Sequence, residues 1–205
     1  MNPMSDIMVL TIGHSNHAAT RLVSLLHAQG VTAIADVRSS PYSRSNPQFN
    51  RALLQESLKA EGIAYVFLGR ELGGRPEDPG CYVEGKVQYG RLAQTPLFKK
   101  GLGRVFKGAG SHRIALLCAE AEPLVCHRTI LVAQELAISG ISVGHIHSDG
   151  ALEAHSDAMS RLVHLLGLDD KDLYRTRAEI IADACALQAK RIAYQDEEVS
   201  EKASA

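Results

Sequence analysis

The chain has 205 residues, of which 45% are hydrophobic and 22% charged, and its formal net charge is −1. These values are typical of one globular domain, and nothing in them demands a nucleic-acid or membrane partner. No apolar run approaches the roughly 20 residues needed to cross a bilayer, and residues 1–8 lack a signal-peptide pattern. Four cysteines without secretory features favour a cytoplasmic location.

The first third of the chain alternates strand and helix patterns. Residues 8–12, 31–37 and 63–68 are short apolar runs, as expected of buried strands. The segments between them, 20–30 and 49–62, carry apolar residues at helical spacing and end in glycine. This order predicts an α/β fold with a doubly wound, mostly parallel, Rossmann-like sheet.

Residues 69–110 interrupt this alternation with turn-forming glycines and prolines, and we expect this excursion to cover the sheet edge or a site. The alternation then resumes, so that a core of about residues 8–150 is predicted. C-terminal helices are expected within 151–196, the last over about 171–194, and the tail 197–205 is polar. No linker divides the chain, so residues 1–205 are predicted to form one domain.

Polar residues follow three of the predicted strands. His14 follows the first, Asp36 and Arg38 end the second, and Cys118 and Glu120 follow a later apolar run. Because the carboxyl ends of parallel strands meet at one edge of a sheet, we expect these side chains to line one pocket. The alternative is structural, with Asp36 and Arg38 as an ion pair and His14 as an interior histidine.

Three further candidates, Cys126, His127 and Arg128, stand where an apolar helix is expected to begin. A thiol at a helix start and near a guanidinium is expected to have a lowered pKa, which suits a nucleophile or a metal ligand. The alternative is a small buried thiol beside a surface His–Arg pair. The spacing matches neither the C-x5-R phosphatase loop nor the C-x-x-C motif.

Two loops could bind an anion. Ser43 lies between two prolines after the second strand, and Arg75 follows the pair Gly73-Gly74, which could act as a hinge. The alternatives are a loop that only turns the chain and a surface ion pair of Arg75. A basic face on the middle helix is best explained as solvated surface, and it consists of Lys99, Lys100, Arg104 and Lys107.

Together these residues resemble the bacterial family called domain of unknown function 488. The matching segments are Thr11-Ile12-Gly13-His14-Ser15, Asp36-Val37-Arg38 with Pro41, Asn46-Pro47-x-Phe49, Leu68-Gly69-x-Glu71-Leu72-Gly73-Gly74-Arg75, Leu117-Cys118-Ala119-Glu120 and Cys126-His127-Arg128. The resemblance extends from residue 11 to about residue 146. It implies a compact α/β fold in a cytoplasmic protein, and it implies no established activity.

The leading hypothesis is an enzyme, a hydrolase or group transferase, that acts on a phosphate-bearing substrate such as a nucleotide or a nucleic-acid end. The residues expected to bind the substrate are Asp36, Arg38, Ser43, Arg75, His127 and Arg128. The nucleophile would be Cys126 or Cys118, and the proton carrier would be Glu120 or His14.

Two alternatives stay open. One is a binding module without turnover, in which the pocket reads a nucleotide or a modified base. The other is a metal site formed by His14, Cys118, Cys126 and His127, which ranks last because the spacing follows no common zinc pattern. The sequence indicates no particular cofactor or oligomeric state.

Overall fold

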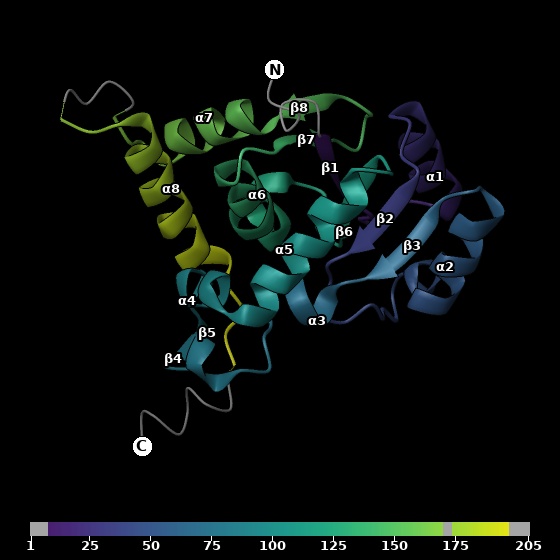
Figure 1. The fold of residues 1–205 in the computed structure, drawn as a ribbon, viewed down its shortest axis with the longest axis horizontal. Helices are drawn as coiled ribbons and strands as arrows, with labels where there is room; N and C mark the ends of the chain where they lie inside the picture. The colour runs from purple at the N-terminus through teal and green to yellow at the C-terminus, as the bar shows by residue number, and fades with distance from the viewer. Residues whose placement is uncertain (1–7, 170–173, 197–205) are drawn as a thin grey trace.

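The centre of the molecule is a six-stranded sheet (Figure 1). Its strands are β1 (Met8–Gly13), β2 (Ala33–Asp36), β3 (Ala64–Phe67), β6 (Ile114–Cys118), β7 (Ser142–Ile146) and β8 (Leu152–Ala154). They lie in the order β3-β2-β6-β1-β7-β8, and all neighbours are parallel except β7 and β8. This computed structural model describes residues 8–169 and 174–196. The predicted α/β fold with a mostly parallel sheet is confirmed.

Helices cover both faces of the sheet, because side chains along each strand alternate between two apolar clusters. In β6, Ala115 and Leu117 join the cluster that includes α1 (Ala19–Ala28) and α2 (Arg51–Ala60). Leu116 and Cys118 join the opposite cluster. That cluster includes residues of α5 (Pro96–Ala109), α6 (Gln134–Ile138), α7 (His155–Leu165) and α8 (Arg177–Ile192), which Figure 1 shows away from α1 and α2.

The position of β6 brings the predicted site together. Ile12 and Gly13 of β1 pair with β6 on one side, and Asp36 of β2 pairs with it on the other. The carboxyl ends of these three strands therefore meet at one edge of the sheet. Gly13 is required there, because a Cβ atom on it would lie 1.7 Å from the backbone oxygen of Glu120.

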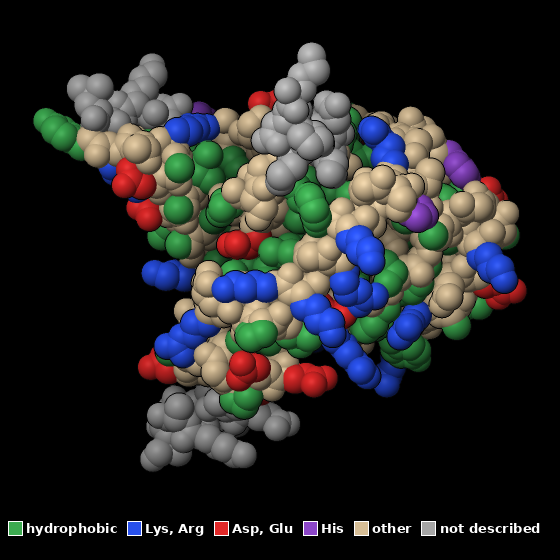
Figure 2. All heavy atoms as spheres, viewed as in Figure 1, with side chains coloured by type: hydrophobic (Ala, Val, Ile, Leu, Met, Phe, Trp, Pro, Cys, Tyr) green, Lys and Arg blue, Asp and Glu red, His purple; other side chains and the backbone are tan. Residues whose placement is uncertain are grey.

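The excursion after β3 contains several short elements. They are α3 (Gly69–Leu72), a 3₁₀ turn (Pro79–Cys81), the hairpin of β4 (Tyr82–Val83) and β5 (Lys86–Val87), and α4 (Tyr89–Gln94), followed by α5. At the start of α5, the Thr95 side chain accepts a hydrogen bond of 3.2 Å from the Phe98 amide. The basic residues Lys99, Lys100, Arg104 and Lys107 are exposed, and Figure 2 shows Lys and Arg side chains gathered over this helix.

The chain after β6 departs from the expected regular helix. Cys126 follows a 3₁₀ turn (Pro123–Val125) and precedes a π-helical segment (Arg128–Ala133) that continues into α6. Such π-helical turns occur often at functional sites. The side chains of Cys126 and Arg128 are thus presented by an irregular helix start.

The C-terminal part also differs in its boundaries from the prediction. Helix α8 begins at a capping box formed by Thr176 and Glu179, while residues 170–173 and the predicted tail 197–205 lie outside the described residues. The helix ends at Ile192, and the carbonyl of Tyr194 accepts a hydrogen bond of 3.0 Å from the Val87 amide. Tyr194 is therefore extended against the β4–β5 hairpin. Within the described ranges, every helix is too short or too polar to cross a lipid bilayer.

Candidate functional site

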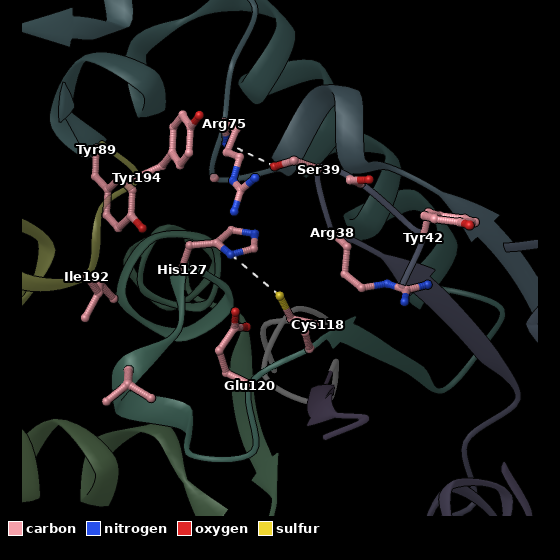
Figure 3. Close-up of a pocket in the computed structure, with 14 residues that line it drawn as sticks. Arg38, Ser39, Tyr42, Arg75, Tyr89, Cys118, Glu120, His127, Ile192 and Tyr194 are labelled. Carbon is pink, nitrogen blue, oxygen red and sulfur yellow. Dashed lines mark hydrogen bonds between the residues drawn. The ribbon is translucent and has the colours of Figure 1, made fainter. Parts of the chain in front are cut away.

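A cavity of about 530 Å³ opens at the carboxyl edge of the sheet (Figure 3). Cys118 and Glu120 line it from the end of β6, and Arg38 lines it from the end of β2. Arg75 of the excursion and Tyr194 close it from the other side. A second cavity of about 420 Å³ shares Arg38 and Glu120 with the first. Its additional lining residues include His14, Ser15, Asn16, Ser43 and Asn46.

Between the cavities lies a buried ion pair of Asp36 and Arg38. The Arg38 Nε and Nη2 groups donate to the two carboxylate oxygens at 2.9 and 2.6 Å, and the Tyr65 hydroxyl donates to the same carboxylate at 2.8 Å. Asp36 has no exposed surface and lines neither cavity. The structural role considered for Asp36 in the sequence is therefore the one that its contacts support.

His14 is bound through both ring nitrogens. Its Nε2 accepts from Arg38 Nη1 at 3.2 Å, so its Nδ1 carries the proton and donates to the Ser15 carbonyl at 2.7 Å. Burial lowers the pKa of His14 to about 4, and the positive charge of Arg38 adds to this effect. The imidazole is thus a neutral interior group at neutral pH, and it orients the Arg38 guanidinium.

The floor of the larger cavity is a cluster of two thiols, an imidazole and a carboxylate. His127 Nδ1 lies 3.7 Å from Cys118 Sγ and 3.9 Å from Cys126 Sγ (Figure 3 draws the first contact). A hydrogen bond of 2.9 Å joins Cys126 Sγ to Glu120 Oε2. On the far side of the ring, His127 Nε2 donates to the Val37 carbonyl at 3.0 Å. This bond fixes the ring so that Nδ1 faces both sulfur atoms.

The two thiols have opposite pKa shifts. The interaction with Cys126 and burial raise the pKa of Cys118 well above its ordinary value. Burial also opposes ionisation of Cys126, but the hydrogen bond with Cys118 and the charges of Arg128 and His127 outweigh it and lower its pKa. The pair therefore favours one thiolate, on Cys126, stabilised by its neighbours.

The pKa values of Glu120 and His127 are also shifted by burial and by neighbouring charges. Partial burial and the nearby Cys126 raise the pKa of Glu120. For His127, burial lowers the pKa, but the interactions with Cys126 and Glu120 raise it above the ordinary value. Glu120, whose side chain is exposed toward the cavity, is thus a carboxyl group with an increased tendency to hold a proton.

Arg128 is fully buried and supports the cluster from behind. Its guanidinium donates to the backbone carbonyls of Glu120 and Ala121, the second at 3.1 Å, and its amide donates to Cys126 Sγ at 3.4 Å. It lines neither cavity. In this structure Arg128 holds the loop after β6 in place from behind the cavities.

Arg75 presents its charge to the cavity. Its guanidinium carbon lies 4.3 Å from the centroid of the Tyr194 ring, and its amide donates to Ser39 Oγ at 3.0 Å. In the part of the chain that the structure describes, no carboxylate pairs with Arg75. Among the described residues, Arg75 therefore makes a cation–π contact in place of the surface ion pair considered as an alternative.

The neighbouring glycines explain how the loop approaches so closely. A Cβ atom on Gly73 would lie 2.3 Å from the carbonyl oxygen of Gly69, and one on Gly74 would lie 3.1 Å from the His127 ring. Gly74 has no positive φ. Close packing thus favours glycine at both positions.

A family model described as "Domain of unknown function DUF488" matches residues 18–134, more than half of the chain. The protein belongs to the DUF488 family. No curated protein and no solved structure matches the chain.

The DUF488 match contains most of the cavity. Among the predicted site residues, Arg38, Arg75, Cys118, Glu120 and His127 line the larger cavity, His14 and Ser43 line the smaller one, and Asp36, Cys126 and Arg128 are buried behind them. All of these except His14 fall within the match.

Three tyrosines of the larger cavity, Tyr42, Tyr89 and Tyr194, were not predicted as site residues. Burial raises the pKa of Tyr89, and the nearby Cys126 and Cys118 add to this effect. Its hydroxyl has no hydrogen-bond partner among the described residues. Tyr194 lies outside the DUF488 match, at the end of the predicted last helix. An aromatic residue at such a position gives no sequence signal of a cavity, because only the fold brings it there.

Proposed function

We propose that this DUF488 protein is an enzyme, a hydrolase or group transferase, that acts on a phosphate-bearing substrate such as a nucleotide or a nucleic-acid end. The observation that carries the proposal is the position of Arg75, a guanidinium without a carboxylate partner among the described residues, on the same cavity as Cys118, Glu120 and His127. A positively charged side chain that faces a cluster of acid–base and thiol groups is suited to binding an anion and to catalysing its conversion.

Arg38 supplies further donors for the anion. A guanidinium has five N–H groups, and three of those of Arg38 bind Asp36 and His14, which leaves two. The bonds to Asp36 and His14 fix the plane of the group, so little side-chain entropy is lost when a ligand binds. Arg75 contributes a charge that no carboxylate pairs with among the described residues, and Arg38 contributes oriented hydrogen bonds.

The two cavities together suit a ligand with more than one part. They share Arg38, Ser40, Tyr42, Ala119 and Glu120, and their volumes of about 530 and 420 Å³ lie in the range of small-molecule sites. The polar lining of the second cavity, which includes Asn16, Ser43 and Asn46, could accept a sugar or a base. A nucleotide fits this division, with its phosphate near Arg75.

Glu120 is the proposed proton carrier. Burial and the nearby Cys126 raise its pKa, which favours a carboxyl group that holds a proton for a leaving group, and it lines both cavities. His14, in contrast, is bound on both nitrogens and has a lowered pKa, so we do not propose it for this role.

Titration calorimetry with inorganic phosphate and with ADP tests the binding step. Arg75→Ala should weaken binding by about 1.5–3 kcal/mol, the usual contribution of a hydrogen bond to a charged group, which corresponds to roughly 10- to 150-fold. Arg70→Ala is the matched control, since Arg70 is an exposed arginine nearby that does not line either cavity. Equal affinity of wild type and Arg75→Ala would contradict the proposal.

Turnover separates an enzyme from a binding module. Phosphate release from phosphate monoesters, nucleoside diphosphates and 5′-phosphorylated oligonucleotides can be followed by phosphorus NMR. Glu120→Gln should lower the rate by about 10²- to 10⁴-fold while keeping the affinity. Binding of ADP without conversion of any of these compounds would instead favour the non-catalytic module.

A further inference from the structure

We propose that Cys118, Cys126 and His127 bind a zinc ion at the floor of the larger cavity, with the fourth coordination position open to the cavity beside Glu120. Within residues 8–169 and 174–196, these three side chains are the group of cysteine, histidine or acidic residues whose ligand atoms lie close enough to share an ion. All three ligand atoms are within 4.8 Å of one another.

The distances match those of a tetrahedral site. With Zn–S bonds of about 2.3 Å and Zn–N bonds of about 2.0–2.1 Å, a sulfur and a nitrogen ligand of one tetrahedral ion are about 3.6 Å apart. His127 Nδ1 is 3.7 Å from Cys118 Sγ and 3.9 Å from Cys126 Sγ. The nitrogen therefore lies at nearly tetrahedral separation from each sulfur, and the two sulfur atoms, within 4.8 Å of each other, would lie about 3.8 Å apart around a bound ion.

The surroundings orient the ligands as metal sites require. A histidine that binds a metal through one nitrogen usually donates its other N–H group to a carbonyl or carboxylate, and His127 Nε2 donates to the Val37 carbonyl at 3.0 Å. Gly74 packs against the ring and holds its plane. The Arg128 amide donates to Cys126 Sγ at 3.4 Å, an interaction that favours a thiolate.

The charges of the cluster also favour a cation. Cys118 and Cys126 are buried, and the Glu120 carboxylate contacts one of them at 2.9 Å. Three acidic groups so close together cannot all ionise without a counter-charge. A divalent ion would allow both thiols to deprotonate and would bind most tightly once they had done so.

The donor set indicates which ion binds and where it faces. Thiolate and imidazole ligands in tetrahedral geometry suit zinc, and three protein ligands with one open position are typical of catalytic zinc. Cys118 and His127 line the cavity, so the open position faces the space between Arg38 and Arg75. The assignment of the three ligands depends only on the geometry of the cluster. Any role of the ion in the reaction depends, in addition, on the proposed function.

Metal analysis and cobalt substitution test the site. Wild-type protein purified without chelators should contain about one zinc ion per chain. After replacement by Co²⁺, it should show the thiolate-to-cobalt charge-transfer band and the visible bands of a tetrahedral ion. Cys118→Ser, Cys126→Ser and His127→Gln should each lose these bands. Cys185→Ser should keep them, because Cys185 is a buried thiol in α8 that contacts Met159.

X-ray absorption of the zinc-loaded wild type provides a readout that does not depend on how the variants fold. It should show two sulfur atoms at about 2.3 Å and lighter atoms at about 2.0–2.1 Å. A wild type that binds neither ion, or a Cys118–Cys126 disulfide in protein purified under reducing conditions, would overturn the site. Titration of ADP on the same samples separates the two proposals: ADP binding by protein that takes up no metal would overturn only the zinc site, and zinc binding without ADP binding would overturn only the proposed function.

Discussion

The guanidinium of Arg75 lies over the ring of Tyr194, with 4.3 Å between its carbon and the ring centroid. The two residues come from distant parts of the chain, and only Arg75 belongs to the segment that matches the family. Ile192, at the end of α8, lines the same cavity. The C-terminal segment of this protein thus positions an arginine of the segment that matches DUF488.

Removal of the Tyr194 ring should weaken the binding of an anionic ligand. A cation–π contact at an exposed site contributes about 0.5–1 kcal/mol, so Tyr194→Ala should raise the dissociation constant for ADP by roughly two- to fivefold. Tyr194→Phe keeps the aromatic face and should bind like wild type. Calorimetry of the three proteins is the measurement, and an unchanged affinity for Tyr194→Ala would mean that the ring does not position Arg75.

A methyl group on Gly74 should disturb the zinc site. Its Cβ atom would lie 3.1 Å from the His127 ring, which must move by a few tenths of an ångström. Changes around a ligating histidine typically lower metal affinity by about 10- to 100-fold, so we expect Gly74→Ala to do the same in competition with a chelator. Gly103→Ala is the control, because a Cβ atom there meets no neighbour and should slightly stabilise α5. Equal zinc affinity of both variants would contradict this prediction.

The apolar periodicity of the chain was sufficient to predict the sheet and most of the site edge. Apolar runs located β1, β2, β3, β6 and β7, and polar residues at strand ends located Arg38, Cys118 and Glu120. The expectation that β3 is buried is wrong, because β3 lies at the edge of the sheet and its residues are exposed or half-buried. The pattern could not predict β8 or the β4–β5 hairpin, because strands of two or three residues are too short to show a period.

The sequence also could not predict the direction in which each side chain of the site points. Asp36 is the last residue of β2 and Arg38 follows two positions later, yet Asp36 is fully buried and lines neither cavity, whereas Arg38 reaches both. Likewise, the separation of eight positions between Cys118 and Cys126 matches no common zinc spacing, and the turn at Pro123–Val125 brings the two thiols together. Such proximity depends on the loop path, which local sequence patterns do not encode.

The buried ion pair of Asp36 and Arg38 should be essential for stability. Asp36→Asn would leave the Arg38 guanidinium buried without a counter-charge, so we expect a loss of about 3–5 kcal/mol in the free energy of unfolding. Glu71→Gln, which removes the partly exposed pair with Arg104, should cost no more than about 1 kcal/mol. Urea denaturation followed by circular dichroism measures both values, and similar losses for the two variants would refute the distinction.

A chain of buried hydrogen bonds runs behind the site. Thr11 Oγ1 contacts His145 Nδ1 at 2.8 Å, His145 Nε2 contacts His155 Nδ1 at 3.0 Å, and His155 Nε2 contacts Gln134 Oε1 at 2.9 Å. Burial lowers the pKa of His145 to about 3 and that of His155 to about 4. Both imidazoles are therefore neutral in the folded protein at neutral pH.

These histidines should make the protein sensitive to acid. Between pH 6.5 and about 4 the unfolded chain binds protons that the folded protein excludes, so the free energy of unfolding should be complete above pH 6.5 and fall as the pH decreases. Each histidine contributes a slope of up to about 1.4 kcal/mol per pH unit. His155→Gln should give a shallower slope than wild type, and the exposed His112→Gln should not. Parallel curves for all three proteins in denaturant titrations at several pH values would exclude this mechanism.

The central place of β6 has a consequence for how the molecule assembles. β1 and β2 do not pair with each other, and each is joined to the sheet's centre through a strand that begins about eighty residues after β2. During synthesis, the first hundred residues therefore contain β1 and β2 but lack β6, the strand that lies between them in the sheet. Only when residues 114–118 emerge can the sheet close, and the same strand carries Cys118 to its place. Closing so long a loop is slow, so β6 joins the sheet, and Cys118 reaches the site, at a late step of folding.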